Sequence, residues 1–566
     1  MTNFGPVVPF SEQLHAVKYR GRGESFKEMT NRIASALADN DAHFGQFRDI
    51  LRHMRFLPGG RIQAAIGSTK HVTAFNCFVS GTLADAFTNE EGCIMQRAAE
   101  AATTMRMGGG IGYDFSTLRP RGALIKKLDS TSSGPISFME IFNAICLCTS
   151  SAGNRRGAQM GVLRCDHPDI EEFIHAKQNE HNLRGFNLSV AITDEFMLAV
   201  KSDSDFDLRF GGETYRTIRA RALWEEIMRS TWDWAEPGVL FIDRINKDNN
   251  LWYAEAIAAT NPCGEQPLSP HAACLLGSFN LVKYVKPDRS FDYDQLSADL
   301  PPVVRAMDNV TDVSSYPLPE QKAEALSKRR MGLGVAGAAN AIEAMGYAYG
   351  SPEFIQTLDK ILQTICIGAY TASVSLAREK GAFPKYDRDL YGQSAFVKKL
   401  PDWLQEAISK YGIRNSHLTS IAPTGTISLC ADNISSAIEP VVRLKFPRQV
   451  NLPEGQVVEV VEDYGYRVFG TQSKTCDHVT PDKHIAVLIA AQRWVDSAVS
   501  KTCNVPATTP WEDFKNIYMK AWEGGAKGCT TFTSGGKRQG IFLETESAPE
   551  GQTCRIDPTT GRRECD

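Results

Sequence analysis

The chain has 566 residues, a formal net charge of −4, and 42% apolar and 23% charged residues. This length suits several domains or one large α/β domain with a sizeable core. The charge is close to neutral and Lys and Arg form no basic run, so nothing indicates a nucleic-acid-binding surface. No stretch of eighteen apolar residues and no export signal are present, which predicts a cytoplasmic protein without a membrane span. The fourteen cysteines are therefore expected to be mostly reduced, with any disulfide being catalytic.

The first part of the chain, residues 1–56, is predicted to be a helical segment. Phe26, Met29 and Ile33 recur at helical spacing among polar residues. A Pro-Gly-Gly turn then leads to Asn76–Val79, whose composition is typical of a strand. Taken alone, the cysteine in this strand would be an ordinary core thiol.

Glycine-rich and polar segments follow between residues 107 and 161. Met107–Phe115 contains four glycines, 119–134 is polar, and 154–161 contains Arg155 and Arg156. Backbone amides and arginine side chains suit nucleotide phosphates. Two adjacent arginines are as often part of a solvated surface, so both interpretations stay open at this point.

The segment Asp166–Ile174 predicts a helix start with an acidic first turn. His167 lies near Cys165 and Asp169, which are possible metal ligands. The spacing provides no second pair of ligands, so we predict no metal site here.

The loop at 261–268 is the most informative stretch of the chain. Proline and glycine flank Cys263, which argues against a helix or a central strand. Asn261, Cys263 and Glu265 alternate, so an extended backbone would direct an amide, a thiol and a carboxylate to one side. Cys274 follows eleven residues after Cys263, in an apolar run.

The chain from 300 to 345 is expected to be helical. Within it, Gly332–Gly337 matches the GxGxxG pattern of dinucleotide-binding folds, and Glu353 lies where such folds place an acid. However, 323–330 has the pattern of a charged helix rather than a buried strand, and Ser351–Glu353 has that of a helix start. We therefore predict that these glycines allow close packing and do not bind a nucleotide.

Two features mark the last third of the chain. In Ile421–Ser428 a glycine lies between two threonines, ahead of a predicted helix, and would expose backbone N–H groups that suit a phosphate. A plain Thr-Gly turn has the same pattern. Residues 480–530 are expected to be helical. The polar stretch after residue 544 is predicted to be a mobile linker that ends with Cys554 and Cys565.

In this order the motifs resemble those of the ribonucleotide reductases, most closely the adenosylcobalamin-dependent class II ribonucleoside-diphosphate reductases. The resemblance runs from about residue 57 to 540. It implies a ten-stranded α/β barrel of two parallel five-stranded halves, with a central active-site finger loop. The expected parts are a helical segment at 1–56, the barrel with its effector loops at 57–543, and a redox tail at 544–566. There is no room before the barrel for the family's ATP cone, so we expect no dATP off switch.

The resemblance also implies the roles of five catalytic residues. Cys263 would become the thiyl radical that takes the 3′ hydrogen of the ribose. Glu265 would act as the base on the 3′ hydroxyl, and Asn261 would hold the substrate hydroxyls. Cys77 and Cys274 would form the redox dithiol that ends as a disulfide. A carboxylate inside a barrel is expected to have a raised pKa.

Binding residues are assigned by the same resemblance. Substrate binding falls on Asn76, Gly108, Pro423, Thr424, Gly425, Thr426, Ile427 and Ser428. Binding of a deoxynucleotide or ATP specificity effector falls on Asp85, Arg119, Arg121, Arg155 and Arg156. The expected partners are a ribonucleotide, with diphosphates favoured over triphosphates, thioredoxin or glutaredoxin, and a second copy of the chain. Cys554 and Cys565 would carry electrons from the protein reductant to the barrel, since an intervening turn could bring their sulfurs together.

The source of the radical separates the classes of this family. Class I large subunits carry two adjacent tyrosines in their C-terminal part, and this sequence contains no adjacent tyrosine pair. The anaerobic class needs a glycyl-radical segment and a four-cysteine metal site, and the paired cysteine spacing is missing. Adenosylcobalamin is therefore the expected cofactor. A minimal class I large subunit with a separate radical-generating subunit is the alternative, and a non-catalytic nucleotide-binding protein is a third possibility.

Overall fold

The structure is a computed structural model. It describes residues 4–126, 128–151, 155–156, 158–178, 182–452, 455–534, 536–537, 554–556 and 563–565.

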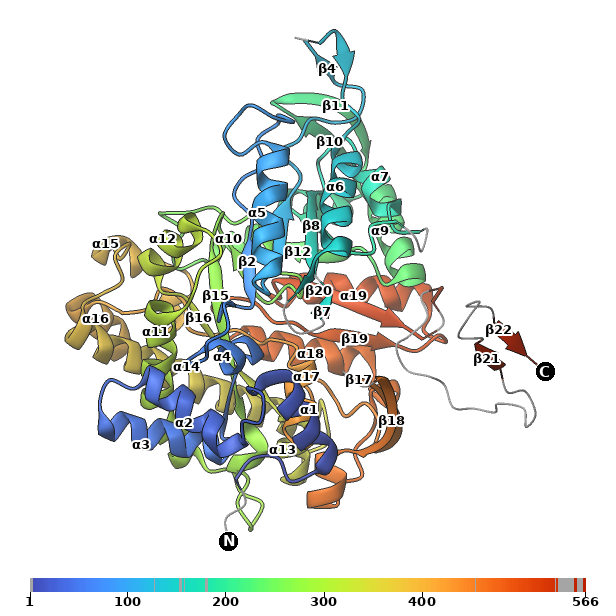
Figure 1. The fold of residues 1–566 in the computed structure, drawn as a ribbon. Helices are drawn as coiled ribbons and strands as arrows, with labels where there is room; N and C mark the ends of the chain where they lie inside the picture. Colours follow the sequence, from blue (N-terminus) through green and yellow to red (C-terminus); the bar gives the residue numbers. More distant parts are fainter. Residues whose placement is uncertain are drawn as a thin grey trace.

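Five parallel strands form the first half of the central barrel (Figure 1). In spatial order they are β2 (Cys77–Val79), β3 (Gly110–Asp114), β8 (Gln159–Arg164), β9 (Phe186–Ile192) and β12 (Gly238–Phe241). Their side chains are mostly buried on both faces, which explains why they are nearly continuous apolar runs in the sequence.

The second half is also parallel. Its strands are β15 (Ala273–Asn280), β16 (Met331–Ala336), β19 (Thr502–Val505) and β20 (Gly528–Thr533). Between β16 and β19 the pairing passes through the segment around Thr419 and Ile421, which forms parallel bridges with Leu333 on one side and Val499 on the other. This segment is therefore the fifth strand of the second half.

Antiparallel pairs join the two halves. β15 pairs with β2, and β12 pairs with β20. The second bridge of the Thr419–Ile421 segment reaches Val499, just before β19. The expected α/β class, with strands in two parallel halves, is thus confirmed. β1 (Phe56–Pro58) adds an antiparallel partner along the far end of β15.

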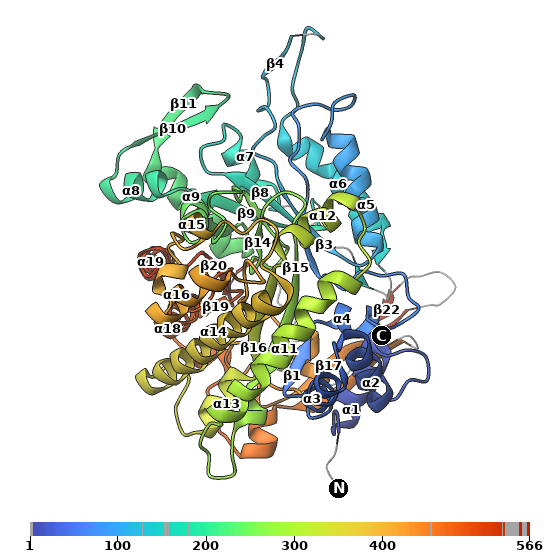
Figure 2. The ribbon, with the colours of Figure 1, turned by 90° about the vertical axis from the view of Figure 1, so that its left-hand side faces the viewer.

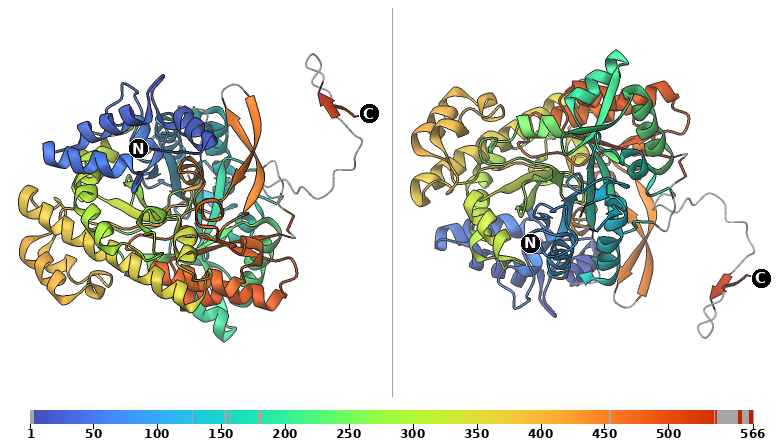
Figure 3. Two further views of the ribbon diagram at one scale, coloured as in Figure 1. Left: turned by 90° about the horizontal axis from the view of Figure 1, so that it is seen from below. Right: turned by 90° about the horizontal axis from the view of Figure 1, so that it is seen from above.

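Helices surround the strands, as the views in Figures 2 and 3 show. From α1 to α10 they are Pro9–Tyr19, Phe26–Leu37, Asp41–Arg52, Gly60–Ala65, Ile94–Arg106, Pro135–Cys148, Ile170–His175, Asp194–Ser202, Ala220–Trp234 and Ile242–Lys247. From α11 to α19 they are Tyr293–Val313, Pro319–Lys328, Ala338–Ala344, Pro352–Lys380, Arg388–Tyr391, Asp402–Tyr411, Gly425–Cys430, Pro481–Gln492 and Trp511–Glu523. One large apolar core lies between helices and strands, and a smaller cluster that includes Cys77 and Cys274 lies inside the barrel.

Short hairpins complete the architecture. They are β4 (Leu124–Ile125) with β5 (Ser130–Thr131), β6 (Ser150–Ser151) with β7 (Arg155–Arg156), β10 (Asp205–Phe210) with β11 (Glu213–Arg219), β17 (Lys445–Leu452) with β18 (Gly455–Glu462), and β21 (Cys554–Ile556) with β22 (Arg563–Cys565). Across the described ranges, no helix combines the length and apolar character needed to cross a membrane.

The N-terminal helices, which the sequence pattern predicts, pack against the barrel helices. Phe26, Met29 and Ile33 of α2 are buried, and Ser25 forms a capping box with Glu28 at the start of that helix. Helices α2 and α3 both lie against α11. The apolar stripe of α2 therefore continues the core of the barrel layer.

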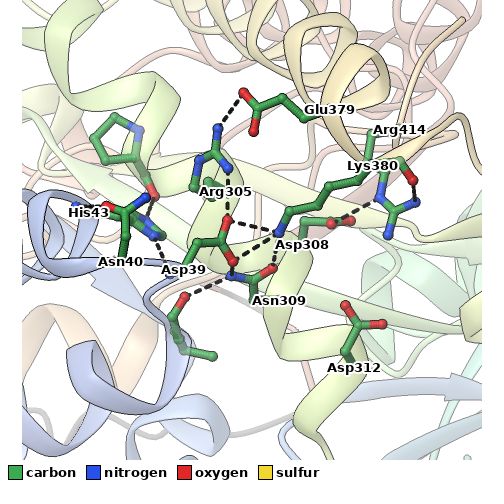
Figure 4. A network of polar contacts seen from close by, with 12 residues as sticks. Asp39, Asn40, His43, Arg305, Asp308, Asn309, Asp312, Glu379, Lys380 and Arg414 are labelled. Atoms are coloured by element: carbon green, nitrogen blue, oxygen red, sulfur yellow. Dashed lines mark hydrogen bonds and ion pairs between the residues drawn. The ribbon is translucent and has the colours of Figure 1, made fainter.

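A polar network fixes the connection between α2 and α3 to the barrel layer (Figure 4). The Asp39 carboxylate is 2.7 Å from Arg305 Nη1 of α11 and 2.9 Å from Lys380 Nζ of α14. Asn309 donates its amide to Asp39 and to the Leu37 carbonyl. Burial raises the pKa of Asp39, but the hydrogen bonds from Arg305, Lys380 and Asn309 outweigh it and hold that pKa well below its usual range.

Two predictions of secondary structure were wrong. Within 300–345, residues 331–336 form the buried strand β16 rather than a helix. Within 480–530, β19 and the start of β20 interrupt the predicted helices. In both places the strands are short and buried in a parallel half-barrel, where no polar–apolar alternation distinguishes a strand from a helix.

Candidate active site

A hairpin carries the predicted active loop through the barrel. β13 (Ala259–Thr260) pairs antiparallel with β14 (Pro267–Leu268), and residues 261–266 connect them. Gly264 has φ +80° and its N–H donates to the Asn261 carbonyl, so the connection is a turn. The extended backbone assumed from the alternation of Asn261, Cys263 and Glu265 is therefore wrong at this point.

The consequence of the turn is that the three side chains differ in exposure. Asn261 and Glu265 are buried, whereas the Cys263 thiol is exposed at the tip of the loop. Gly264 faces open space, because a Cβ atom built there would meet nothing within 4 Å. The loop thus presents a thiol to an open region and keeps its amide and carboxylate in the barrel.

Hydrogen bonds from both halves of the barrel fix the loop backbone. Asn187 of β9 donates its amide to the Pro262 carbonyl at 2.8 Å. The Glu265 carbonyl accepts from Ser420 Oγ and from the Ala498 amide, each at 3.0 Å. The loop is therefore held between the two half-barrels, which sets the position of its side chains.

Glycines in the barrel strands make room for this hairpin. A Cβ atom on Gly112 of β3 would lie 1.8 Å from the Thr260 carbonyl oxygen, and one on Gly110 would lie 3.0 Å from Pro262. On the opposite half, a Cβ on Gly332 of β16 would lie 2.6 Å from the Gln266 amide. The GxGxxG match thus contributes close packing, as predicted, because Gly332 lies within a strand that contacts the loop.

Cys77 lies at the centre of the site. Its backbone pairs with that of Cys274, directly across the antiparallel junction of β2 and β15. Opposite residues in such a ladder have Cα atoms about 4.5–5.5 Å apart, within the range that a disulfide spans. Asn261 Nδ2 donates to Cys77 Sγ at 3.2 Å, and Cys77 Sγ donates to Glu265 Oε1 at 3.9 Å. The structure thus brings together Cys77, Cys274, Asn261 and Glu265.

Burial dominates the electrostatics of this group. It raises the pKa of Glu265 to about 7, although hydrogen bonds from Asn261 and Cys77 lower it in part. Burial, followed by the nearby charges of Glu265, Cys274 and Cys263, raises the pKa of Cys77 well above its usual value. At neutral pH the site therefore holds a carboxyl group near its midpoint beside a protonated thiol, which is a suitable arrangement for moving a proton.

The predicted phosphate segment is a helix start at the end of the fifth strand of the second half. Thr424 has φ 51° and precedes α17. Its Oγ1 accepts from the Ala437 amide at 2.7 Å, while Ser428 Oγ and Ser436 Oγ lie 3.0 Å apart. A Cβ on Gly425 would meet nothing within 4 Å, so the backbone there faces open space. This geometry leaves the segment accessible to an anion.

Asn76 and Gly108 lie at the same end of β2 and β3. The Gly110 amide donates to the Asn76 carbonyl at 2.9 Å. Gly108 has φ +96°, and a Cβ there would lie 2.4 Å from the guanidinium carbon of Arg61. Gly108 thus lies in the turn that leads into β3, and the Asn76 carbonyl holds the first residue of that strand.

Among the predicted effector residues, Asp85 and Arg119 contact each other, and Arg121 contacts a neighbouring helix. Arg119 is paired with Asp85 at 2.7 Å, and Arg121 with Glu172 at 2.5 Å. Arg155 and Arg156 form β7, opposite Ser150–Ser151 of β6, but their side chains lie outside what the structure describes. For the tail, the register of β21 and β22 sets Cys554 opposite Cys565, while their side chains and residues 557–562 also lie outside the described part.

Sequence reasoning missed several residues that support the site. Ser420, Gln266 and Arg330 are buried polar residues at or near the loop, and Asn187 is an exposed residue of β9 whose amide binds the loop backbone. Three of them have a sequence signal that could have been used, namely a polar or charged residue next to a buried apolar run. Gln266 had none, because it lies inside a loop where polar residues are ordinary.

An α/β barrel whose central loop carries a thiol beside a pair of facing cysteines is the framework of a thiol-dependent oxidoreductase. A sequence model described as "Ribonucleotide reductase, barrel domain" matches residues 76–532. The chain belongs to the ribonucleotide reductase family.

The chain is similar over most of its length to individual members of that family. It is 34% identical over 542 residues to a vitamin B12-dependent ribonucleoside-diphosphate reductase of Mycobacterium tuberculosis, covering 90% of this chain and 75% of the relative. The protein of the same name from Thermoplasma acidophilum is 32% identical, with 90% and 67% covered. A ribonucleoside-diphosphate reductase subunit alpha of Chlamydia pneumoniae is 26% identical, with 90% and 55% covered.

Proposed function

We propose that this chain reduces ribonucleotides, with diphosphates as the substrate, to 2′-deoxyribonucleotides by thiyl-radical chemistry, and that it depends on adenosylcobalamin. The observation that carries the proposal is the arrangement around Cys77. This thiol lies opposite Cys274 and contacts both Asn261 and Glu265 of the loop that presents Cys263. The names of the Mycobacterium and Thermoplasma relatives support both the reaction and the cofactor.

The site fits a large radical-generating cofactor at the tip of the loop. The Cys263 thiol is exposed, and the space beside Gly264 is open. These two residues would face the reactive side of the cofactor. Bound adenosylcobalamin supplies the radical that converts the Cys263 thiol into a thiyl, and the protein supplies position and protection.

The remaining steps belong to residues of this chain. The Cys263 thiyl takes the 3′ hydrogen of the ribose while Glu265 accepts the proton of the 3′ hydroxyl. Asn261 holds the substrate hydroxyls through its amide. The Cys77–Cys274 pair gives a proton to the 2′ hydroxyl, which leaves as water, and then a hydrogen atom to the 2′ carbon. The pair becomes a disulfide as its remaining electron, together with the proton held by Glu265, returns to the 3′ carbonyl group and restores the radical at the 3′ carbon with its hydroxyl group. Cys263 then returns the hydrogen to the 3′ carbon.

The open backbone at Thr424–Ser428 would bind the substrate phosphates. Hydroxyl groups and N–H groups at a helix start are suitable partners for an anion. Asn76 and Gly108 would line the adjacent side of the substrate, at the end of β2 and β3. The substrate would thus lie between the phosphate segment and the loop tip.

Electrons would reach the barrel through the C-terminal cysteines. Cys77 and Cys274 are almost fully buried, so a protein reductant would have difficulty reaching their disulfide directly. Cys554 and Cys565 lie opposite each other in a backbone pair, as a dithiol carrier requires. The tail would reduce the barrel disulfide and then be reduced by thioredoxin or glutaredoxin.

Effector binding and dimer formation would involve the region around α5 and α6. Asp85, Arg119, Arg121, Arg155 and Arg156 would bind the base and phosphates of a deoxynucleotide or ATP effector. Phe87, Met95 and Leu147 are exposed apolar side chains in the same region. Exposed apolar groups of this kind are typical of an interface, here with a second copy of the chain.

A minimal class I large subunit remains the less favoured candidate. The similarity to the Chlamydia subunit alpha supports it at 26% identity, against 32–34% for the B12-dependent relatives. The two candidates differ in what the purified chain needs. A cobalamin-dependent enzyme turns over with adenosylcobalamin alone, whereas a class I subunit needs a second protein.

The decisive experiment is to add adenosylcobalamin, a ribonucleoside diphosphate and dithiothreitol to the purified chain and measure deoxynucleotide. Cys263→Ser should abolish product while nucleotide binding and folding persist, because serine is close in size but forms no comparable radical. The matched control is Cys148→Ser, another exposed cysteine, which should retain activity. Product formation by Cys263→Ser above background would contradict the assignment.

A further inference from the structure

Arg330 lies level with Cys274, immediately before β16. β15 and β16 pair in parallel from Leu275 opposite Met331 to Asn280 opposite Ala336. Extending the same register back by one residue sets Cys274 opposite Arg330. Neighbouring residues across a parallel pair lie about 5 Å apart, so these two residues are adjacent on the barrel wall.

Strand register and the alternation of side chains place Arg330 and Cys274 on the same face of the sheet. One pair further along, Leu276 is opposite Gly332. A Cβ on Gly332 would lie 2.6 Å from the amide of Gln266 in the central loop, so this position faces inwards. Side chains alternate along a strand, and residues two positions apart therefore share a face. Arg330 and Cys274 occupy the next inward-facing positions.

The Arg330 guanidinium is buried with an incomplete set of partners. The side chain is 3% exposed and is ion-paired with Glu255 through Nη2. Its buried Nε–H has no hydrogen-bond partner within the described residues. An unpaired buried donor costs free energy, and an anion beside it would be stabilised.

Glu255 does not neutralise Arg330 alone. Its second oxygen lies 2.6 Å from Lys328 Nζ, and Lys328 is also paired with Glu324. The four side chains carry two positive and two negative charges, so the cluster is balanced before Cys274 ionises. Burial, with the charges of Asp496 and Glu265, raises the pKa of Cys274, and the charge of Arg330 opposes that increase. Cys77 is the thiol in direct contact with the Glu265 carboxyl group.

We propose that Arg330 stabilises the thiolate of Cys274 when the Cys77–Cys274 disulfide is reduced, so that an incoming dithiol attacks Cys77 and releases Cys274. The proposal rests on the proposed function, because it assumes that these two cysteines form a disulfide in each catalytic cycle. It assigns unequal roles to the two sulfurs, based on the different charges beside them.

The exchange involves two electrons and two protons. A thiolate of the dithiol attacks Cys77 Sγ, a new S–S bond forms, and the Cys77–Cys274 bond breaks with its electron pair left on Cys274 Sγ. That thiolate remains beside Arg330 until it takes a proton. The second thiol of the dithiol then loses its proton and attacks the mixed disulfide, which releases Cys77. Cys77 and Cys274 end as thiols, and the dithiol ends as a disulfide.

The test measures disulfide reduction without turnover. The full chain carrying Cys554→Ser and Cys565→Ser is oxidised, and formation of the Cys77–Cys274 disulfide is verified by peptide mapping. Dithiothreitol is added, and samples are alkylated over time to follow the two thiols. A nearby charge shifts a thiol pKa by about 1–3 units. The rate of thiol–disulfide exchange changes by roughly half a power of ten for each unit of that pKa. Arg330→Gln should therefore slow reduction by about 3- to 30-fold, and Arg330→Lys should restore most of the rate.

Arg329→Gln is the matched control. Arg329 is an equally buried arginine one position earlier, but it is paired with Asp308 and Asp312 on the helix side of the strand. Its substitution should lower stability and leave the reduction rate of the folded protein unchanged. An unchanged rate in Arg330→Gln, or an equal slowing in Arg329→Gln, would overturn the proposal.

A second variant decides the question if Arg330→Gln fails to fold. Glu255→Gln removes the anion that competes for Arg330 and should accelerate reduction, so a slower or unchanged rate overturns the proposal. The assay uses no ribonucleotide. A wild-type chain that forms the disulfide but makes no deoxynucleotide would refute the proposed function and leave the Arg330 measurement decisive. A wild-type chain that forms no Cys77–Cys274 disulfide would refute the role of Arg330.

Discussion

Replacement of Glu265 by glutamine should stabilise the protein at alkaline pH and reduce its activity. Burial raises the pKa of Glu265 from 4.5 to about 7. Between these values the folded state keeps a proton that the unfolded state has lost, so the free energy of unfolding falls as the pH rises. A shift of about 2.5 units corresponds to about 3 kcal/mol. This loss of stability is absent below pH 4.5 and complete above pH 7.

Glutamine carries no charge at any pH and avoids this cost. The free energy of unfolding of Glu265→Gln, measured with urea, should exceed that of the wild type by about 3 kcal/mol more at pH 8 than at pH 4.5. Turnover should fall by roughly 10²- to 10⁴-fold, the usual contribution of a general base. Glu195→Gln, at an exposed carboxylate, should show neither effect. The same stability difference at both pH values would refute the reasoning.

Three further predictions concern packing, an ion pair and the tail. Gly112→Ala should displace the active loop and lower both stability and activity, because the new Cβ would lie 1.8 Å from the Thr260 carbonyl oxygen. The control is Gly45→Ala in α3, where a Cβ meets nothing within 4 Å. This substitution should stabilise the protein by about 0.5–1 kcal/mol in thermal or urea unfolding. Asp39→Asn should lower the free energy of unfolding by about 1 kcal/mol at pH 7, since solvent partly screens this exposed carboxylate. That loss is complete above pH 3.8 and should shrink as the pH falls from 3.8 towards the lowered pKa of Asp39 in the folded state. The double substitution Cys554→Ser and Cys565→Ser should stop multiple turnover with thioredoxin and spare turnover with a small dithiol. Normal turnover with thioredoxin would show that the barrel disulfide is reached directly.

The sequence by itself determined the local chemistry of this protein. Proline and glycine around Cys263 predicted a loop, and the structure has a turn there. The spacing of Phe26, Met29 and Ile33 predicted a helix with one buried face, and α2 has it. These features depend on a few neighbouring residues, so local rules are sufficient to predict them. The order of the motifs resembles that of a known family, and this resemblance predicted the fold.

Tertiary structure decided which residues face one another. Cys77 and Cys274 are 197 positions apart, and only the antiparallel pairing of β2 with β15 places them opposite each other. The glycines of β3 and β16 are needed for packing only because the hairpin of the active loop lies against them. β16 itself was predicted as helix, since a strand buried on both faces has no alternation that reveals it. The raised pKa of Glu265 and the alignment of Arg330 with Cys274 likewise depend on burial and strand register, which arise when distant segments pack together.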